Sequence, residues 1–306
     1  MNKKLLIIIS LSAILASPFF GSSGPFPSFY VFKTIRIPRV LLGILAGGTL
    51  SLCGMVFQNI FKSTLATPYT LGTSSGAAFG AAVAIACRFS SLAVTGSAFA
   101  GAAGAIAIVY AVFHLKKNCR LSDMILIGVA VNFFFSSLLL MIHYLVDYHR
   151  TFEIIHWLLG KLTTGTNERL LYLTPLVLIF TYIFMQSLEL DLLAAGDDIA
   201  HSRGVEVKKL RRELFLAVSI ATASIVSICG TISFVGMISP HICRKIVGTN
   251  HKQLIPLSIL FGAAFLTFSD ALARTIISPA EIPVGIITAL CGGPFFLILL
   301  IRSKEL

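Results

Sequence analysis

The stretch RIPRVLLGILAGGTLSLCG, residues 36–54, places two arginines at the head of an apolar run long enough to cross a membrane as a helix. Runs of about 18 or more apolar residues recur along the whole chain, and each indicates a candidate transmembrane helix. A membrane β-barrel would instead show short segments of alternating polarity. The sequence therefore predicts an all-α polytopic membrane protein.

Composition supports the same class. The 306 residues are 56% hydrophobic and only 12% charged, and the mean hydropathy is +0.91. A soluble domain of this size needs more polar groups to cover its surface. The net charge of +11 is therefore assigned to loop lysines and arginines that set topology and meet anionic lipid, and not to nucleic-acid binding.

Ten apolar segments follow one another without an extended soluble domain between them. The eighth is short and contains Pro240. The first could be a cleaved signal peptide or a retained helix, and the even count favours retention. The segments lie near residues 5–20, 40–60, 70–87, 92–113, 121–146, 170–188, 213–232, 234–247, 254–273 and 283–301.

The positive charges predict the orientation. An even number of spans puts both termini on one side, and a cytoplasmic N-terminus leaves sixteen lysines and arginines inside against eight outside. Both termini are therefore expected in the cytoplasm. Arg36 and Arg39 then fall outside, so the positive-inside rule does not explain their position. Contact with lipid phosphates, or snorkelling toward the interface, is one possible explanation.

Two connections are longer than turns. Residues 147–169 are expected outside, with an interfacial helix over 152–162 and Trp157 as its membrane anchor. Residues 189–212 are polar and cytoplasmic, and they predict one or two short helices followed by a turn at Gly204. This segment is either a platform for a cytoplasmic partner or a solvated loop.

Motifs for catalysis and metal binding are missing from the sequence. It has no G-x-x-x-x-G-K-[ST] nucleotide loop, no HExxH and no GxSxG. Its six cysteines form no CxxC pair and indicate packing residues. Asp270 lies four residues before Arg274, so a local ion pair is its expected role. Neither a catalytic residue nor a metal ligand is predicted.

Small residues gather in two stretches, GGTLSLCG (47–54) and LGTSSGAAFGAAVA (71–84). Glycine and alanine at spacings of three and four let helix backbones approach closely where lipid gives no hydrophobic drive. These stretches predict tightly packed helix contacts, along which a translocation path could also run.

Three stretches together resemble the permeases of iron-chelate and cobalamin ABC importers, the FecCD type. The resemblance covers essentially the whole chain. The stretches are RIPRVLLGILAGGTLSLCGMVFQNIFKSTLATPYTLGTSSGAAFGA (36–81), ISFVGMISPHICRKIVG (232–248) and DALARTIISPAEIPVGIITALCGGPFFLILLIR (270–302).

The resemblance implies a type II ABC importer permease fold, with a single transmembrane domain over residues 1–306 and a cytoplasmic coupling loop at about 189–206. It implies partners as well: a second copy of the chain, a cytoplasmic ABC ATPase dimer that holds ATP and Mg²⁺, and a substrate-binding protein outside. This subunit would bind no cofactor itself and would sit in the bacterial cell membrane.

Site residues follow from the same resemblance. Arg36, Arg39 and Arg274 match arginines that receive acidic residues of the binding protein, and Ser63 and Leu65 match the inner gate. The family usually has Asn-Pro before Leu-Ala, whereas this chain has Ser63-Thr64, which removes a fixed backbone angle. The residues expected to contact the ATPase are Ala195, Gly196, Asp197, Asp198, Ser202, Arg203 and Gly204.

The sequence thus predicts the permease subunit of an importer for a metal chelate, with a ferric siderophore first and haem or cobalamin as alternatives. An ion-gradient-driven secondary transporter is the competing function, but it predicts buried acids at mid-span. An intramembrane enzyme would need a nucleophile–base pair, which the motifs do not provide.

Overall fold

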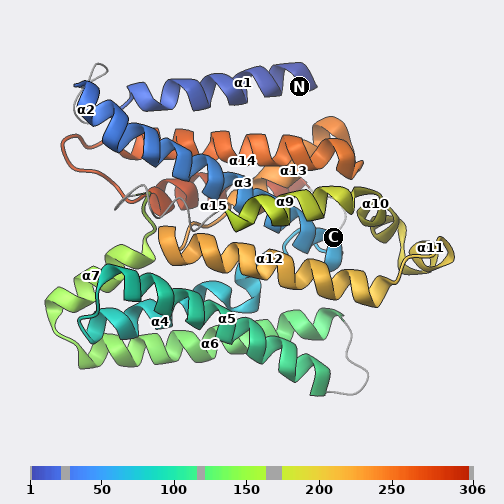
Figure 1. The fold of residues 1–306 in the computed structure, drawn as a ribbon, viewed down its shortest axis with the longest axis horizontal. Coiled ribbons are helices and arrows are strands. Elements are labelled where there is room, and N and C mark those ends of the chain that lie inside the picture. The colour runs from blue at the N-terminus through green and yellow to red at the C-terminus, as the bar shows by residue number, and fades with distance from the viewer. Residues whose placement is uncertain (1, 22–27, 116–120, 163–173, 303–306) are drawn as a thin grey trace. The chain divides into compact units, whose positions relative to one another are not determined.

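The computed structural model describes the chain except for residues 1, 22–27, 116–120, 163–173 and 303–306, and every regular element in the described part is helical (Figure 1). All ten predicted apolar segments contain helices. The elements are α1 (Lys3–Ala16), η1 (Ser17–Phe19), α2 (Phe29–Val31), η2 (Phe32–Arg36), α3 (Ile37–Ile60), η3 (Pro68–Leu71), α4 (Thr73–Ala86), α5 (Ser91–Leu115), α6 (Leu121–Leu145), α7 (Tyr148–Leu158), α9 (Pro175–Met185), α10 (Ser187–Ala195), α11 (Asp197–Ser202), α12 (Val207–Cys229), α13 (Val235–Val247), α14 (His251–Ala273) and α15 (Val284–Arg302).

Helix length and composition support several membrane crossings. Five described helices are long and apolar enough to span a bilayer: the continuous stretch Phe29–Ile60, α5, α6, α12 and α14. The pair α9 and α10, bent by 54°, makes a sixth if it counts as one broken span, and α4 and α15 contribute shorter apolar helices. The predicted class, an all-α multi-pass membrane protein, is confirmed.

The chain divides into two compact units. Unit 1 contains Met1–Met55, Leu159–Phe180 and Ile232–Leu306, and unit 2 contains Val56–Leu158 and Thr181–Thr231. Two helices, α3 and α9, contribute residues to both units. The single permease domain expected over residues 1–306 stays a prediction.

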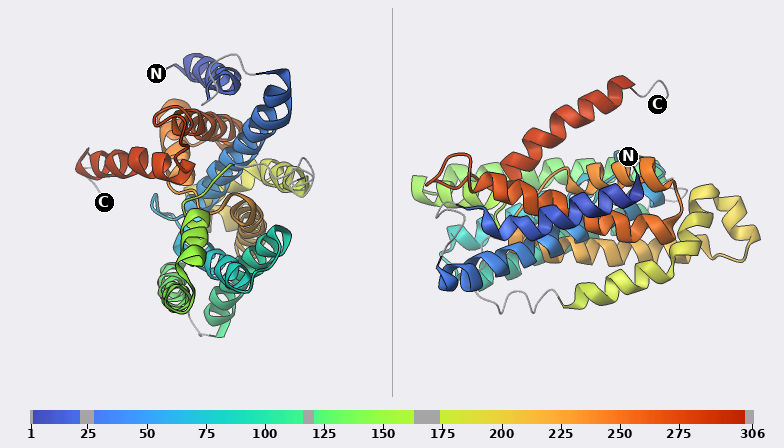
Figure 2. Two further views of the ribbon diagram at one scale, coloured as in Figure 1. Left: turned by 90° about the vertical axis from the view of Figure 1, so that its left-hand side faces the viewer. Right: turned by 90° about the horizontal axis from the view of Figure 1, so that it is seen from above.

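In unit 1, the first helix packs along α14, and the two lie side by side in Figures 1 and 2. The Lys3 ammonium donates to the Gln253 side chain at 2.9 Å, and the Ser17 hydroxyl donates to the carbonyl of Thr267 at 3.2 Å. The two helices are therefore parallel, as the predicted topology requires of the first and ninth spans. Retention of α1 in the mature protein stays a prediction.

Glycines bring the helices of unit 1 together. A Cβ added at Gly54 of α3 would overlap the carbonyl oxygen of Gly236 in α13, and one at Gly47 would overlap the carbonyl oxygen of Gly262 in α14. The backbones approach this closely only because both sides lack a side chain. The close contact predicted for residues 47–54 is confirmed.

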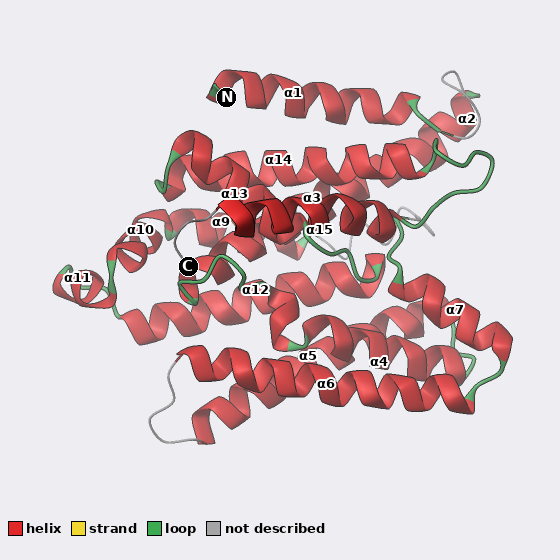
Figure 3. Cartoon of the chain, turned by 180° about the vertical axis from the view of Figure 1, so that it is seen from behind, coloured by secondary structure: helices red, strands yellow, loops and turns green. Residues whose placement is uncertain are grey.

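In unit 2, the helices α4, α5 and α6 pack against one another, and α7 covers one end of α4 (Figure 3). A Cβ at Gly76 would lie 2.5 Å from the carbonyl oxygen of Gly101, which confirms the close contact predicted for residues 71–84. The helix α7 begins four residues before the expected start at 152. Trp157 is partly buried against two apolar clusters, so its ring packs on protein. Its role as a membrane anchor stays a prediction.

Candidate functional site: a coupling element and an arginine cluster

The polar segment of unit 2 forms two short helices joined by glycine. Gly196, with φ +143°, separates α10 from α11, and Gly204, with φ +83°, ends the turn that leads to α12. Asp197 and Asp198 occupy the first turn of α11, where carboxylates favour the helix dipole. The predicted short helices and the predicted turn at Gly204 are both confirmed. We call residues 187–204 the coupling element.

The coupling element is fastened to the rest of unit 2. Leu190, Leu193 and Ala200 are completely buried. The buried Asn59 amide, at the end of α3, donates to the carbonyl of Leu190 at 2.9 Å. A freely solvated loop would show neither feature, so the structure favours the alternative of a rigid platform.

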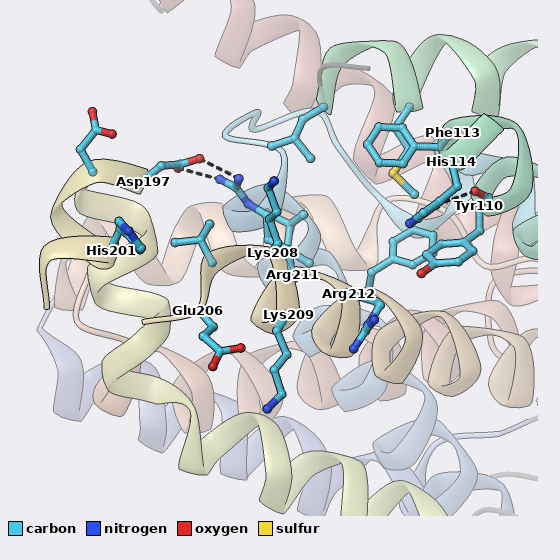
Figure 4. A pocket seen from close by; sticks show the side chains of 16 residues that line it. Tyr110, Phe113, His114, Asp197, His201, Glu206, Lys208, Lys209, Arg211 and Arg212 are labelled. Atoms are coloured by element: carbon cyan, nitrogen blue, oxygen red, sulfur yellow. Dashed lines mark hydrogen bonds and ion pairs between the residues drawn. The ribbon is translucent and has the colours of Figure 1, made fainter. Parts of the chain in front are cut away.

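Asp197 connects the coupling element to two other parts of unit 2. Its oxygens accept hydrogen bonds from Nη1 and Nη2 of Arg211, both at 2.7 Å, and the Lys62 ammonium lies 3.0 Å from Oδ1 (Figure 4 draws the Arg211 pair). The bonds from Arg211 lower the pKa of the Asp197 carboxyl, Lys62 adds to this shift, and partial burial opposes it. Asp197 therefore stays ionised at neutral pH.

The remaining predicted contact residues leave an outward-facing surface. Ala195, Asp198, Ser202, Arg203 and Gly204 are all exposed. Ile199 is also exposed, to 48%, at the middle of α11. Sequence reasoning missed Ile199, although an apolar residue within a short polar helix was the available signal. An exposed apolar side chain with a polar rim is typical of a protein interface.

A cavity of about 1080 Å³ opens beside α11, between the end of α5 and the starts of α6 and α12 (Figure 4). Tyr110, Phe113 and Phe215 line one side, and charged residues of α11 and α12 line the other. The sequence did not predict this cavity, because the basic run at 208–212 was assigned to membrane topology alone.

The predicted gate residues lie in the turn after α3. The Lys62 amide donates to Asn59 O and the Ser63 amide to Gln58 O, both at 3.2 Å, which ends the helix in a Schellman motif. Lys62 takes the left-handed position at φ +50°. The Ser63 hydroxyl then accepts from the Leu65 amide at 3.3 Å, and Leu65 is exposed. The gate turn, residues 62–65, thus begins at the lysine that contacts Asp197.

Unit 1 contains a second charged site, the arginine cluster. Arg39 Nη2 lies 2.9 Å from Asp270 Oδ1, and Arg39 Nη1 lies 2.7 Å from Glu281 Oε2. Arg274 Nε lies 3.0 Å from Asp270 Oδ2. The local pair predicted between Asp270 and Arg274 is confirmed, and Arg39 joins it from a distant part of the sequence.

All three arginines expected on the outer surface are buried in unit 1. Arg36, Arg39 and Arg274 are only 3%, 9% and 3% exposed. Arg36 donates to the carbonyl of Pro18 at 2.9 Å, and Arg274 donates to the carbonyl of Ser17 at 3.3 Å. The docking role expected of these arginines stays a prediction, and in unit 1 two of them are held by carbonyl groups of η1.

The described residues contain no group of three or more histidine, cysteine or acidic side chains that could hold a metal ion, and their five cysteines are free. Ion pairs join Asp197 to Lys62 and Arg211 in unit 2, and they join Asp270 to Arg39 and Arg274 in unit 1.

Comparison with known proteins assigns the family. Residues 5–302 match the FecCD transport family. The chain belongs to this family. An uncharacterized ABC transporter permease protein of Bacillus subtilis is 39% identical over 296 residues, which cover 94% of this chain and 84% of the relative.

Two further comparisons carry more informative names. The hemin transport system permease protein of Yersinia pestis is 34% identical, over 90% of this chain and 85% of that protein. A solved structure described as an inward-facing conformation of a putative metal-chelate type ABC transporter matches with a TM-score of 0.89 and 32% identity, covering 98% of both chains. This FecCD chain therefore has the fold of an ABC transporter permease.

Proposed function

We propose that this chain is the transmembrane permease subunit of a binding-protein-dependent ABC importer for a metal chelate. The proposed complex contains two copies of the chain, a cytoplasmic ABC ATPase dimer that carries ATP and Mg²⁺, and a substrate-binding protein outside. Both termini lie in the cytoplasm, and the complex sits in the bacterial cell membrane. ATP chemistry belongs to the ATPase, and this subunit supplies the pathway.

The coupling element is the observation that carries the proposal. It is a rigid, anchored pair of short helices at the end of unit 2 where α12 begins (Figures 1 and 3). Its exposed surface combines Ile199 with polar neighbours, which suits insertion into a groove of a soluble partner. A permease that depends on an ATPase needs such a surface, and a protein working alone does not.

Docking of the binding protein is proposed at the arginine cluster. Arg39 contacts both Asp270 and Glu281, and Arg274 contacts Asp270. An acidic residue of the binding protein would compete with Glu281, whose side chain is 40% exposed, for the contact with Arg39. Such electrostatic contacts mainly set encounter rate and register.

A ferric siderophore is the proposed substrate, with haem and cobalamin as the other members of the class. The hemin permease relative supports a metal chelate. The secondary-transporter alternative is less favoured, because a proton carrier needs an acid that is free to change its charge. Asp270 is the one acid among the buried described residues, and Arg39 and Arg274 already pair with it.

The test combines assembly and transport. Ile199→Asp should prevent co-purification of the chain with the ATPase produced alongside it, whereas Ile155→Asp, an apolar residue of similar exposure on α7, should not. In a deletion strain, uptake of a radiolabelled ferric siderophore or of hemin should require the chain and should stop with vanadate. Uptake that resists vanadate but collapses with a protonophore at normal ATP would refute an ATP-driven importer.

A further inference from the structure

We propose that Asp197 and Lys62 form the link that carries movement of the coupling element to the gate turn. The inference rests on the proposed function, because it assigns a mechanical role to residues of an ATP-driven permease. Asp197 was expected to touch the ATPase. Its carboxylate instead faces Lys62 and Arg211 of the same unit.

The contacts place Asp197 between the two parts that must move together. The Oδ1 atom of Asp197 contacts Lys62, and only Ser63 and Thr64 stand between Lys62 and Leu65 in the chain, so the ion pair ends on the gate turn itself. Its bidentate contact with Arg211, whose side chain is 15% exposed, fixes the carboxylate against the first turns of α12. A displacement of α11 must therefore either carry Lys62 with it or break the pair.

The backbone of Lys62 supports a role for its side chain. The left-handed position of a Schellman motif is usually glycine, because a Cβ is disfavoured there. Lys62 occupies this position at φ +50°. A strained residue held by its surroundings is a reason to look for a function of that residue, and the contact with Asp197 supplies one.

The same unit offers a matched control. Arg88 ends α4 in the same motif, with its amide donating to Ile85 O and the Phe89 amide donating to Ala84 O, both at 3.0 Å. Its φ is +59°, and among the described residues no ion pair involves it. Replacing either cation with glycine relieves the backbone, but only the change at Lys62 removes the link.

The experiment follows the gate and the ATPase separately. The permease–ATPase complex is reconstituted in liposomes with Leu65→Cys as a reporter in a background lacking the native cysteines. The maleimide labelling rate of this cysteine is measured without nucleotide and after trapping with ATP and vanadate. Lys62→Gly, Lys62→Arg, Asp197→Asn and Arg88→Gly are compared, and ATP hydrolysis is recorded for each.

We expect Lys62→Gly and Asp197→Asn to reduce the ATP-dependent change in labelling about fivefold, the effect of losing a half-exposed ion pair. ATP hydrolysis should continue, Lys62→Arg should restore the response, and Arg88→Gly should match the parent. An undiminished response in Lys62→Gly would overturn the link, because that variant keeps the turn intact. A parent complex with no labelling response to ATP would instead refute the proposed function, and the link with it.

Discussion

Replacing Asp270 with asparagine should destabilise the protein far more than replacing Glu281 with glutamine. Both acids contact Arg39, but the side chain of Asp270 is 2% exposed and that of Glu281 is 40% exposed. Asp270→Asn leaves Arg39 and Arg274 short of a buried counter-ion, which costs about 3–5 kcal/mol. Glu281→Gln removes a solvent-screened contact, which is worth about 0–1 kcal/mol.

The assay is thermal unfolding of the purified protein in detergent, followed by the fluorescence of a thiol-reactive dye as buried cysteines become accessible. At about 2 °C for each kcal/mol, Asp270→Asn should lower the midpoint by roughly 6–10 °C and Glu281→Gln by about 2 °C or less. Raising the salt concentration should shrink only the smaller difference, because buried pairs are screened little. Equal midpoints for the two variants would refute the argument from burial.

Three further predictions concern backbone and charge. Gly204→Val should uncouple ATP hydrolysis from uptake while the protein still inserts normally into the membrane. Nothing lies within 4 Å of the added Cβ, but a side chain at φ +83° costs about 1–2 kcal/mol, and tight coupling in the variant would contradict this reasoning. Gly54→Ala, which overlaps Gly236, should lower abundance in the membrane on an immunoblot, whereas Gly96→Ala, with open space around it, should not. The pKa of Asp197 is lowered in the folded protein, so the ion pairs of its carboxylate contribute fully to stability above the usual aspartate pKa and are lost only as pH falls through the lower folded pKa. The ratio of uptake to ATP hydrolysis should therefore show no step attributable to Asp197 between about pH 5 and pH 8.

Helix positions were predictable because a membrane helix is a local property of the sequence. Each apolar run satisfies its own backbone hydrogen bonds, so length and composition indicate where a helix forms without knowledge of its neighbours. Close helix contacts at the glycine stretches were also predictable, because two helix backbones approach closely only where small residues stand. The bend between α9 and α10 was not predicted, because no proline or glycine stands at Gln186 to mark it.

Side-chain pairing across the sequence was much less predictable. The i,i+4 rule gave Asp270 its local partner Arg274 but gave no sign of Arg39, which is 231 residues away. Likewise, the acids of α11 suited a helix N-terminus, and nothing local indicated that Asp197 turns toward Lys62. A carboxylate can accept several donors at once, so a satisfied local pair does not exhaust it.

Counting positive charges predicts on which side of the membrane a basic residue lies, but not which group its side chain contacts. The count placed Arg36, Arg39 and Arg274 on one side, and the structure of unit 1 gathers them in one cluster. In the same count Lys62 and Arg211 are two of the sixteen on the cytoplasmic side, and in unit 2 both contact Asp197. Topology thus predicts which charges share an end of the protein, whereas burial decides whether they face lipid, a partner or one another. In both units the sequence did not indicate which acid pairs with the basic residues. The positive-inside rule gives acids little weight, yet the acids are the groups that the basic side chains contact inside each unit.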